Sequence, residues 1–218
     1  MIQESLFETP DLRKQVWAKD EIVFSVDTSQ PRILRNIMKL YNGGNAFECD
    51  VTYSKGVFYK EIPPPRLKFD LVPQAEGVQQ ADARHLPLED SSVGSLVFDP
   101  PFKASNSKVK GIIEQRFTAF PSMLHLWDFY HDALVEFMRV LKPNGLLVFK
   151  CQDGVSSGIN HMTHTEVEQQ AQAVGFAAED LFILLSKSVL MSPNMARQKH
   201  ARKTHSFVYV FRKPRFAK

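Results

Sequence analysis

The chain has 218 residues, a formal net charge of +3, 44% hydrophobic residues and 23% charged residues. These proportions are ordinary for a globular protein, so we expect a single domain over residues 1–218 and exclude a disordered or fibrous chain. No apolar run approaches the roughly 20 residues that a membrane-spanning helix requires, so a membrane protein is also excluded.

The cysteines and the N-terminal sequence indicate the compartment. Cys49 and Cys151 lie far apart and form no CxxC motif, which excludes a disulfide framework or a zinc site. The N-terminal sequence lacks the pattern of a secretory signal. We therefore expect a cytoplasmic protein that binds no metal.

Basic residues are concentrated at the end of the chain. No acidic residue follows Asp180, whereas the same stretch contains Lys187, Arg197, Lys199, Arg202, Lys203, Arg212, Lys213, Arg215 and Lys218. This asymmetry is typical of a surface that binds a polyanion, because each phosphate contact releases counterions. A solvated basic tail is the alternative.

The first regular element is expected to be a helix at the end of an N-terminal extension, together spanning residues 1–44. Ser29 is suited to cap the start of this helix, and Pro31 fits its first turn. Apolar residues follow at helical spacing until Gly43 and Gly44 end the pattern.

Four short apolar runs follow, at residues 46–50, 67–72, 77–82 and 95–99. Each of them ends on an acidic residue or carries one near its end. In parallel sheets the carboxyl ends of the strands face the ligand. The pattern therefore predicts parallel strands beside a binding site.

The second half of the chain alternates between helices and strands. We expect a helix over 126–141, a strand over 146–151, a helix over 164–176, and strands over 181–186 and 206–213. The last two strands are joined without a clear crossover helix, so the last strand should be antiparallel to its neighbour. The alternation predicts a three-layer α/β sandwich.

The segment "LVFDPPF" (96–102) follows a predicted strand and precedes a helix that ends in "RVLKPNGLLVF" (139–149). This combination resembles the catalytic segment of S-adenosylmethionine-dependent DNA amino-methyltransferases, which methylate N6 of adenine or N4 of cytosine. The resemblance covers roughly residues 45–150 and the final strand. It implies S-adenosyl-L-methionine as cofactor. It also implies a Rossmann-like class I methyltransferase sandwich, with a mostly parallel seven-stranded sheet and an antiparallel last strand.

The chemistry of amine methylation explains the residue types at 99–102. The amine of a base is a poor nucleophile because its lone pair is delocalised, and it becomes reactive when acceptors hold its two N–H groups. We assign these acceptors to the Asp99 carboxylate and the Pro100 carbonyl, which Pro100 and Pro101 make rigid. Phe102 offers a ring on which an extruded base stacks. The alternative is a simple turn with Phe102 packed in the core.

The resemblance also implies cofactor-binding residues. In the first loop, Asp50 would face the methionine amino group and Gly56 would allow close backbone approach. Asp70 takes the place of the acidic ribose ligand, Asp82 would accept from the cofactor adenine, and Ala83 would contact its ring. For Asp50 an ordinary strand end, and for Asp70 a solvated surface carboxylate, remain the alternatives.

Two basic segments are the expected nucleic-acid contacts. Residues 103–124 are predicted to form a mobile loop that covers the cofactor and touches the target strand or, alternatively, a plain connector. The region 187–205 would lie beside the motif if the last strands form a hairpin. The residues assigned to nucleic-acid binding are Lys103, Lys108, Lys110, Arg116, Arg197, Lys199, Arg202 and Lys203. The chain has no room for a separate target-recognition domain, so a partner subunit is an alternative source of recognition.

The substrate stays open at this stage. Adenine N6 in DNA ranks first, cytosine N4 in DNA second and an RNA base third, because one acceptor geometry serves any planar amine. A protein side chain ranks fourth. A catalytically silent nucleic-acid-binding subunit is the alternative from another class, and the atypical loop "DVTYSKG" (50–56), with its single glycine, favours it.

Overall fold

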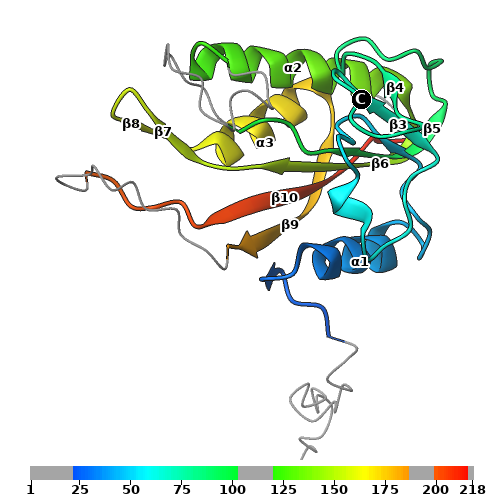
Figure 1. The fold of residues 1–218 in the computed structure, drawn as a ribbon, viewed down its shortest axis with the longest axis horizontal. Helices are drawn as coiled ribbons and strands as arrows, with labels where there is room; N and C mark the ends of the chain where they lie inside the picture. The colour runs from blue at the N-terminus through cyan, green and yellow to red at the C-terminus, as the bar shows by residue number, and fades with distance from the viewer. Residues whose placement is uncertain (1–21, 103–119, 187–198, 216–218) are drawn as a thin grey trace, which may run out of the picture.

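The computed structural model describes residues 22–102, 120–186 and 199–215. A large sheet occupies the centre, with α1 (Gln30–Tyr41) on one face and α2 (Met123–Val140) and α3 (Thr163–Val174) on the other (Figure 1). This arrangement confirms the predicted three-layer α/β sandwich.

The large sheet contains eight strands in the order β1-β9-β10-β6-β5-β2-β3-β4. Their bounds are β1 Val26–Asp27, β2 Cys49–Asp50, β3 Leu67–Asp70, β4 Gln79–Gln80, β5 Val93–Phe98, β6 Leu141–Cys151, β9 Ala177–Leu185 and β10 His205–Arg212. All pair in parallel except β10, which is antiparallel to both β6 and β9. The predicted antiparallel last strand is confirmed, and β1 adds an edge strand to the seven expected.

The helices start and end where the local sequence favours it. The Ser29 hydroxyl caps α1 by accepting from the Arg32 N–H at 3.4 Å, and Ser122 caps α2 in the same way through the His125 N–H. Gly175 ends α3 with φ at 111°, a left-handed conformation that glycine adopts without strain. Between β2 and β3 lies a single turn of 3₁₀-helix, η2 (Val57–Tyr59), in the space that the sequence leaves for at most a short helix.

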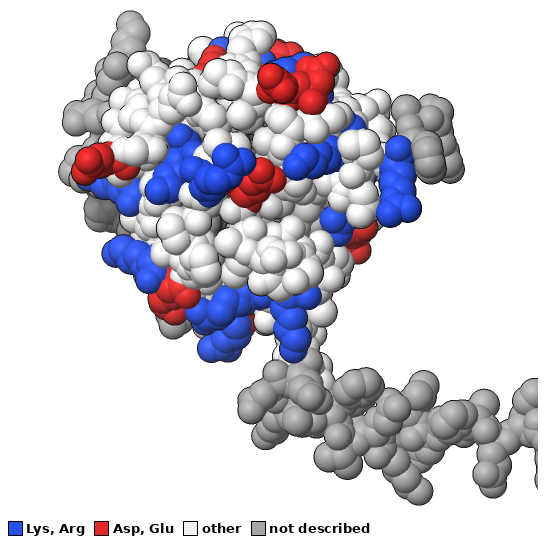
Figure 2. All heavy atoms as spheres, turned by 90° about the vertical axis from the view of Figure 1, so that its right-hand side faces the viewer, with Lys and Arg blue, Asp and Glu red and all other residues white. Residues whose placement is uncertain are grey.

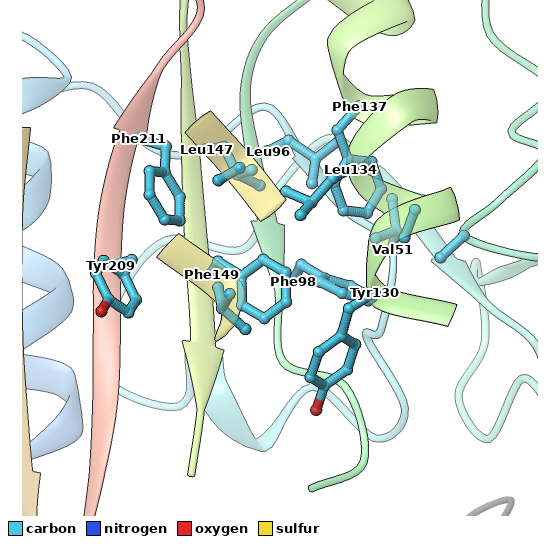
Figure 3. Close-up of a cluster of buried hydrophobic side chains, with 14 of the residues drawn as sticks. Val51, Leu96, Phe98, Tyr130, Leu134, Phe137, Leu147, Phe149, Tyr209 and Phe211 are labelled. Carbon is cyan, nitrogen blue, oxygen red and sulfur yellow. The ribbon is translucent and has the colours of Figure 1, made fainter. Parts of the chain in front are cut away.

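The central strands are buried on both faces, and alternate side chains supply two separate cores. Leu147 and Phe149 of β6 belong to the core beneath α2 and α3, whereas Leu146 and Val148 belong to the core beside α1. This alternation follows from the two-residue period of a strand. In the first core, Phe98 meets the rings of its neighbours from the next strand and from α2 (Figure 3).

A small antiparallel hairpin that the sequence reading did not predict follows β6. β7 (Gly154–Ser156) pairs with β8 (Ile159–His161) across a turn in which Ser157 and Gly158 have φ values of 52° and 76°. Two successive positive φ values match the twist of the flanking strands. Strands of three residues carry too little alternation to be recognised in a sequence. The hairpin projects beyond the edge at which β6 ends (Figure 1).

Some expectations fall partly outside the described residues. These are most of the N-terminal extension, most of the loop 103–124 and most of the region 187–205. Cys49 and Cys151 are both buried free thiols. Within the described ranges, no helix is both long and apolar enough to cross a bilayer.

The core beneath α2 should carry much of the stability. Phe137→Ala removes a ring that is 0% exposed and packs 4.9 Å from the Phe98 ring, measured between centroids. We expect the free energy of unfolding to fall by about 3–5 kcal/mol in urea denaturation. Leu124→Ala in the same helix, where the side chain is 66% exposed, should change it by less than about 0.5 kcal/mol. Equal losses in the two variants would contradict this assignment of the core.

Candidate active site

The strand order reverses between β2 and β5, and a cleft opens where these strands end. From β2 the chain proceeds outward through β3 and β4, whereas β5 and β6 lie on the other side of β2. Ligands of open α/β sheets bind outside the carboxyl ends of the strands at such a switch point. The cleft here has a volume of about 180 Å³. Its lining residues are Val51, Thr52, Ser54, Asp70, Leu71, Val72, Gln74, Asp82, Ala83, Arg84, Asp99, Pro101, Phe120 and Phe129.

The segment from Asp99 to Pro101 is fixed at both ends. The Asp99 N–H donates to the Thr52 hydroxyl at 2.8 Å, which ties the end of β5 to the loop after β2. The Tyr130 hydroxyl of α2 donates to the Pro101 carbonyl at 2.7 Å, and in Figure 3 this hydroxyl points out of the apolar cluster. The two prolines further restrict the backbone between these contacts.

The Asp99 carboxyl group is largely desolvated. Its side chain is 24% exposed, and Oδ1 is inaccessible to solvent and accepts no hydrogen bond from a described residue. The Lys150 ammonium lies 3.4 Å from Oδ1 and 3.4 Å from Oδ2. Burial raises the pKa of Asp99, and the positive charge of Lys150 opposes this rise in pKa.

Lys150 is a site residue that the sequence reading missed. It is the penultimate residue of β6, beside β5, so the sheet brings it next to Asp99 although 51 positions separate them. The signal in the sequence is a lysine that follows the buried run "LLVF" at the end of a predicted central strand. Thr52 and Tyr130 were missed as well, because neither contact follows from a motif.

Three of the predicted cofactor residues line the cleft together. Asp70 ends β3, and its two carboxylate oxygens accept from the N–H groups of Ser54 and Val72 at 2.8 Å each. Asp82 and Ala83 lie just beyond β4. These contacts with backbone donors fix the Asp70 carboxylate, and no residue in the described ranges forms an ion pair with it.

Asp82 is neutralised within the chain. Arg84 approaches its carboxylate through Nε at 3.0 and 3.2 Å and through the terminal nitrogen at 2.7 Å. This fork lowers the pKa of Asp82, chiefly through the side-chain hydrogen bonds from Arg84. The Arg84 guanidinium also lies 5.6 Å from the Phe129 ring centroid. A ligand that approaches Asp82 therefore meets an ion pair rather than a bare carboxylate.

The other two predicted cofactor residues do not line the cleft. The Asp50 carboxylate is 2% exposed and accepts from the Tyr59 hydroxyl at 2.7 Å and the Thr52 N–H at 2.7 Å. Gly56 has φ at 69°, and a Cβ there would lie 2.6 Å from the Tyr53 hydroxyl. The absence of a side chain at Gly56 therefore allows the Tyr53 side chain to approach the backbone closely.

The ring of Phe102 also lies away from the cleft lining. It is half-buried, and its centroid lies 5.4 Å from the Lys150 ammonium. The aromatic wall of the cleft comes instead from Phe120 and Phe129, whose centroids are 5.1 Å apart. Pro100 is buried beneath the segment.

The described part of the basic region lies at the same edge as the cleft. The Thr204 carbonyl accepts from the Ser186 N–H at 2.7 Å, so the chain before β10 continues beyond the end of β9. Lys199 is exposed there, and Arg202 and Lys203 are half-buried. The predicted contacts outside the described residues are Lys103, Lys108, Lys110, Arg116 and Arg197.

The opposite edge, where β6 begins, is shown in Figure 2 and mixes basic with acidic side chains. Ion pairs in this region join Arg66 to Glu48 at 2.8 Å and Arg212 to Glu179 at 2.7 Å. Two of the arginines at the edge opposite the cleft are therefore paired with glutamates of the same chain.

Comparison with known proteins gives the fold. No protein-family model and no curated protein sequence matches the chain. Among solved structures, the [4+2]-cyclase SpnF has a TM-score of 0.50 at 13% identity, over 84% of this chain and 81% of that chain. The chain shares with that structure a Rossmann-like three-layer α/β fold, here with a mostly parallel sheet and an antiparallel last strand. The sequence expectation for the fold is confirmed.

Two similar structures are methylases. A proposed DNA modification methylase of Thermus thermophilus, solved with S-adenosyl-L-methionine, has a TM-score of 0.44 at 21% identity, over 62% of this chain and 54% of that chain. The PvuII cytosine-N4-specific DNA methyltransferase has a TM-score of 0.45 at 17% identity, over 63% of this chain and 49% of that chain. The chain thus matches about half the length of these methylases.

Asp50 should make the stability depend on pH. Burial raises the pKa of Asp50 from 3.8 to about 7, so the folded state binds this proton more tightly than the unfolded state does. The resulting stabilisation is fully present below about pH 4 and is lost as the pH rises through about 7. Asp50→Asn removes the titration. From pH 4 to pH 8 we therefore expect wild type to lose stability relative to the variant, at about 1.4 kcal/mol for each unit of raised pKa.

Urea denaturation of wild type and Asp50→Asn across this pH range measures the difference. Asp128→Asn, at an exposed position on α2, is the control. Its difference from wild type in the free energy of unfolding should be the same at every pH. Parallel stability curves for wild type and Asp50→Asn would contradict the assigned pKa.

Proposed function

We propose that the protein transfers the methyl group of S-adenosyl-L-methionine to the exocyclic amine of a nucleobase, with adenine N6 in DNA as the first candidate. The observation that carries this proposal is the Asp99 carboxyl group at the end of β5. It lines the cleft, it is mostly buried, and its Oδ1 accepts no hydrogen bond from a described residue. A buried acceptor without a donor is costly unless a ligand supplies the donor. An amine is such a ligand.

The cleft fits the proposed cofactor through its carboxylates. Asp70, at the end of β3, has oxygens with further acceptor capacity and is held by backbone N–H groups, which suits the hydroxyl groups of a ribose. Asp82 and Ala83, which line the cleft at the next strand end, are the proposed contacts of the adenine. When bound, S-adenosyl-L-methionine supplies an electrophilic methyl group on a sulfonium. Asp50 has no part in this proposal, because its oxygens are occupied by Tyr59 and Thr52.

The residues around Asp99 prepare the amine for attack. Asp99 accepts one N–H, and the Pro100 carbonyl accepts the other, so the nitrogen lone pair is freed from conjugation with the ring. The anchors at Thr52 and Tyr130 hold the two acceptors in place before the substrate arrives. The nitrogen gains a positive charge as the new N–C bond forms, and Asp99 takes the proton that the nitrogen then releases. A raised pKa favours Asp99 in this second role.

Nucleic acid as the substrate is supported by the charge at the edge that contains the cleft. Lys199, Arg202 and Lys203 lie at this edge, and they are suited to phosphate contacts. Of the remaining cations assigned to nucleic-acid binding, Arg197 adjoins this part of the chain in sequence, whereas Lys103, Lys108, Lys110 and Arg116 follow the segment that contains Asp99. Such contacts fix orientation on the strand and carry no base preference, so the choice between adenine and cytosine rests with the cleft.

Asp99→Ala should separate catalysis from cofactor binding. We expect methyl transfer to fall by at least about 100-fold, because the acceptor that orients the amine is lost. The dissociation constant for S-adenosyl-L-methionine, measured by calorimetry, should stay within about threefold of wild type, because Asp70 and Asp82 are intact. Turnover is measured by mass spectrometry of nucleosides after incubation with unmethylated DNA and, in parallel, with RNA.

The control for this experiment is Asp128→Ala, which removes an exposed carboxylate from α2 and should leave turnover unchanged. N6-methyladenine or N4-methylcytosine in the product identifies the target base. Undiminished turnover by Asp99→Ala would remove the proposed role of Asp99. Cofactor binding without methylation of either nucleic acid would point to a silent subunit or another acceptor.

Asp70→Asn should weaken cofactor binding. The two carboxylate oxygens of Asp70 accept from two backbone N–H groups. The side-chain amide of the variant has a single oxygen, which can replace only one of these acceptors, and its NH₂ group would face the other N–H. We expect at least about a tenfold loss of affinity for S-adenosyl-L-methionine in calorimetry. The matched control is Glu76→Gln, an exposed carboxylate in the loop that follows β3. Equal affinities of Asp70→Asn and wild type would show that Asp70 does not hold the cofactor.

A further inference from the structure

The Lys150 ammonium is held by more than its carboxylate partner. The side chain is 12% exposed, and its Nζ donates to the Gln30 side-chain oxygen at 3.0 Å. It also lies 5.0 Å from the centroid of the Phe58 ring and 5.4 Å from that of the Phe102 ring. Both distances are within the range of cation–π attraction. We call these three residues, Gln30, Phe58 and Phe102, the Lys150 enclosure.

The enclosure comes from three parts of the chain that are far apart in sequence. Gln30 opens α1, Phe58 lies in η2 on the link between β2 and β3, and Phe102 follows the two prolines. None of these residues lines the cleft. They therefore determine where the ammonium sits without occupying the space assigned to a ligand.

We propose that Lys150 is a positioning residue for Asp99, whose carboxylate it keeps ionised and oriented while leaving one oxygen available to the substrate amine. This inference deepens the proposed function and rests on it. The proposal also changes the role of Phe102. Its ring helps to hold the Lys150 ammonium instead of stacking against the substrate base.

The electrostatics around Asp99 make this partner necessary. Among the described residues, the other ionisable groups coupled to Asp99 are Asp50 at the end of β2 and Tyr130 on α2. Neither is cationic, so neither compensates for the loss of water around the carboxylate. An opposite charge within 4–6 Å favours the ionised form of a carboxyl group, and Lys150 supplies it at 3.4 Å.

The geometry also explains why Lys150 does not block the site. Its contact with Oδ2 at 3.4 Å is long for a charge-assisted hydrogen bond, and Oδ1 receives charge but no hydrogen bond. Oδ1 is inaccessible to solvent, so the exposed part of the Asp99 side chain lies on its other atoms. Oδ2, which has only this one long contact with Lys150, keeps acceptor capacity for a shorter bond. An amine substrate adds that bond without displacing the ammonium from its enclosure.

The test compares neutral and charged replacements of Lys150 in the full-length protein. Lys150→Met removes the charge at similar length, Lys150→Gln is a second neutral variant, and Lys150→Arg keeps the charge. Lys142→Met is the matched control, because this exposed lysine lies on the same strand at its other end. Circular dichroism melting identifies any variant that does not fold, and the remaining neutral variant then carries the comparison.

The first readout does not depend on turnover. The Asp99 carboxyl carbon, assigned through its loss in Asp99→Asn, is titrated by ¹³C NMR. We expect the midpoint to rise by about 1 to 3 pH units in the neutral variants, because removal of the cation leaves burial unopposed. The midpoint should stay near the wild-type value in Lys150→Arg and in Lys142→Met. An unchanged midpoint in the neutral variants would overturn the proposal.

The second readout is the pH dependence of kcat/KM. Because Asp99 must be ionised to take the proton that the methylated amine releases, the acid limb of the kcat/KM profile should move to higher pH in the neutral variants, by the same amount as the NMR midpoint. Lys150→Arg should restore its position. A uniform loss of activity at every pH would indicate a merely structural role and would also overturn the proposal. If wild type methylates no acceptor, the proposed function fails, whereas the NMR titration still decides the coupling of Lys150 to Asp99.

Discussion

The central constraint on this molecule is a carboxyl group that lies where water is scarce and beside an ammonium group. Asp99 ends a buried strand, and the backbone on either side of it is anchored by Thr52 and Tyr130. Burial favours the neutral acid, and a single ammonium from the next strand opposes that tendency. The proposed chemistry depends on this balance, because only the ionised group can take the proton that the methylated amine releases.

The sheet topology brings the partners of this carboxylate together. β5 lies between β2 and β6, so the residues that follow β2 and those that end β6 flank Asp99 on its two sides. The core beneath α2 fixes Tyr130 through aromatic packing with Phe98 and Phe149. A rigid, dry core on one face of the sheet is therefore what allows a hydroxyl group from a helix to hold the Pro101 carbonyl at the strand end.

Local patterns in the sequence were sufficient for most of the elements, although not for β1 or the β7–β8 hairpin, and for part of the site. Helical spacing and caps located α1, α2 and α3, and apolar runs that end in carboxylates located the strands around Asp70, Asp82 and Asp99. What the sequence could not supply was pairing across the sheet. Lys150 and Asp99 meet because β6 lies beside β5, and Asp50 turns toward Tyr59 because η2 folds back over β2. Such contacts depend on tertiary packing, which leaves no periodic signal.

The carboxylates at the carboxyl edge differ in how their charge is compensated, and this difference assigns them distinct work. Among the described residues, Asp70 accepts from two backbone N–H groups, and the proposed function assigns its remaining acceptor capacity to a ligand that donates hydroxyl hydrogens. Asp82 is paired with Arg84 in a fork, so its charge is already compensated within the chain. Asp99 lies between these cases, since Lys150 balances its charge and leaves acceptor capacity free. An acceptor that is ionised yet incompletely bonded is the state that activation of a weakly nucleophilic amine requires, and only Asp99 among the three combines both properties.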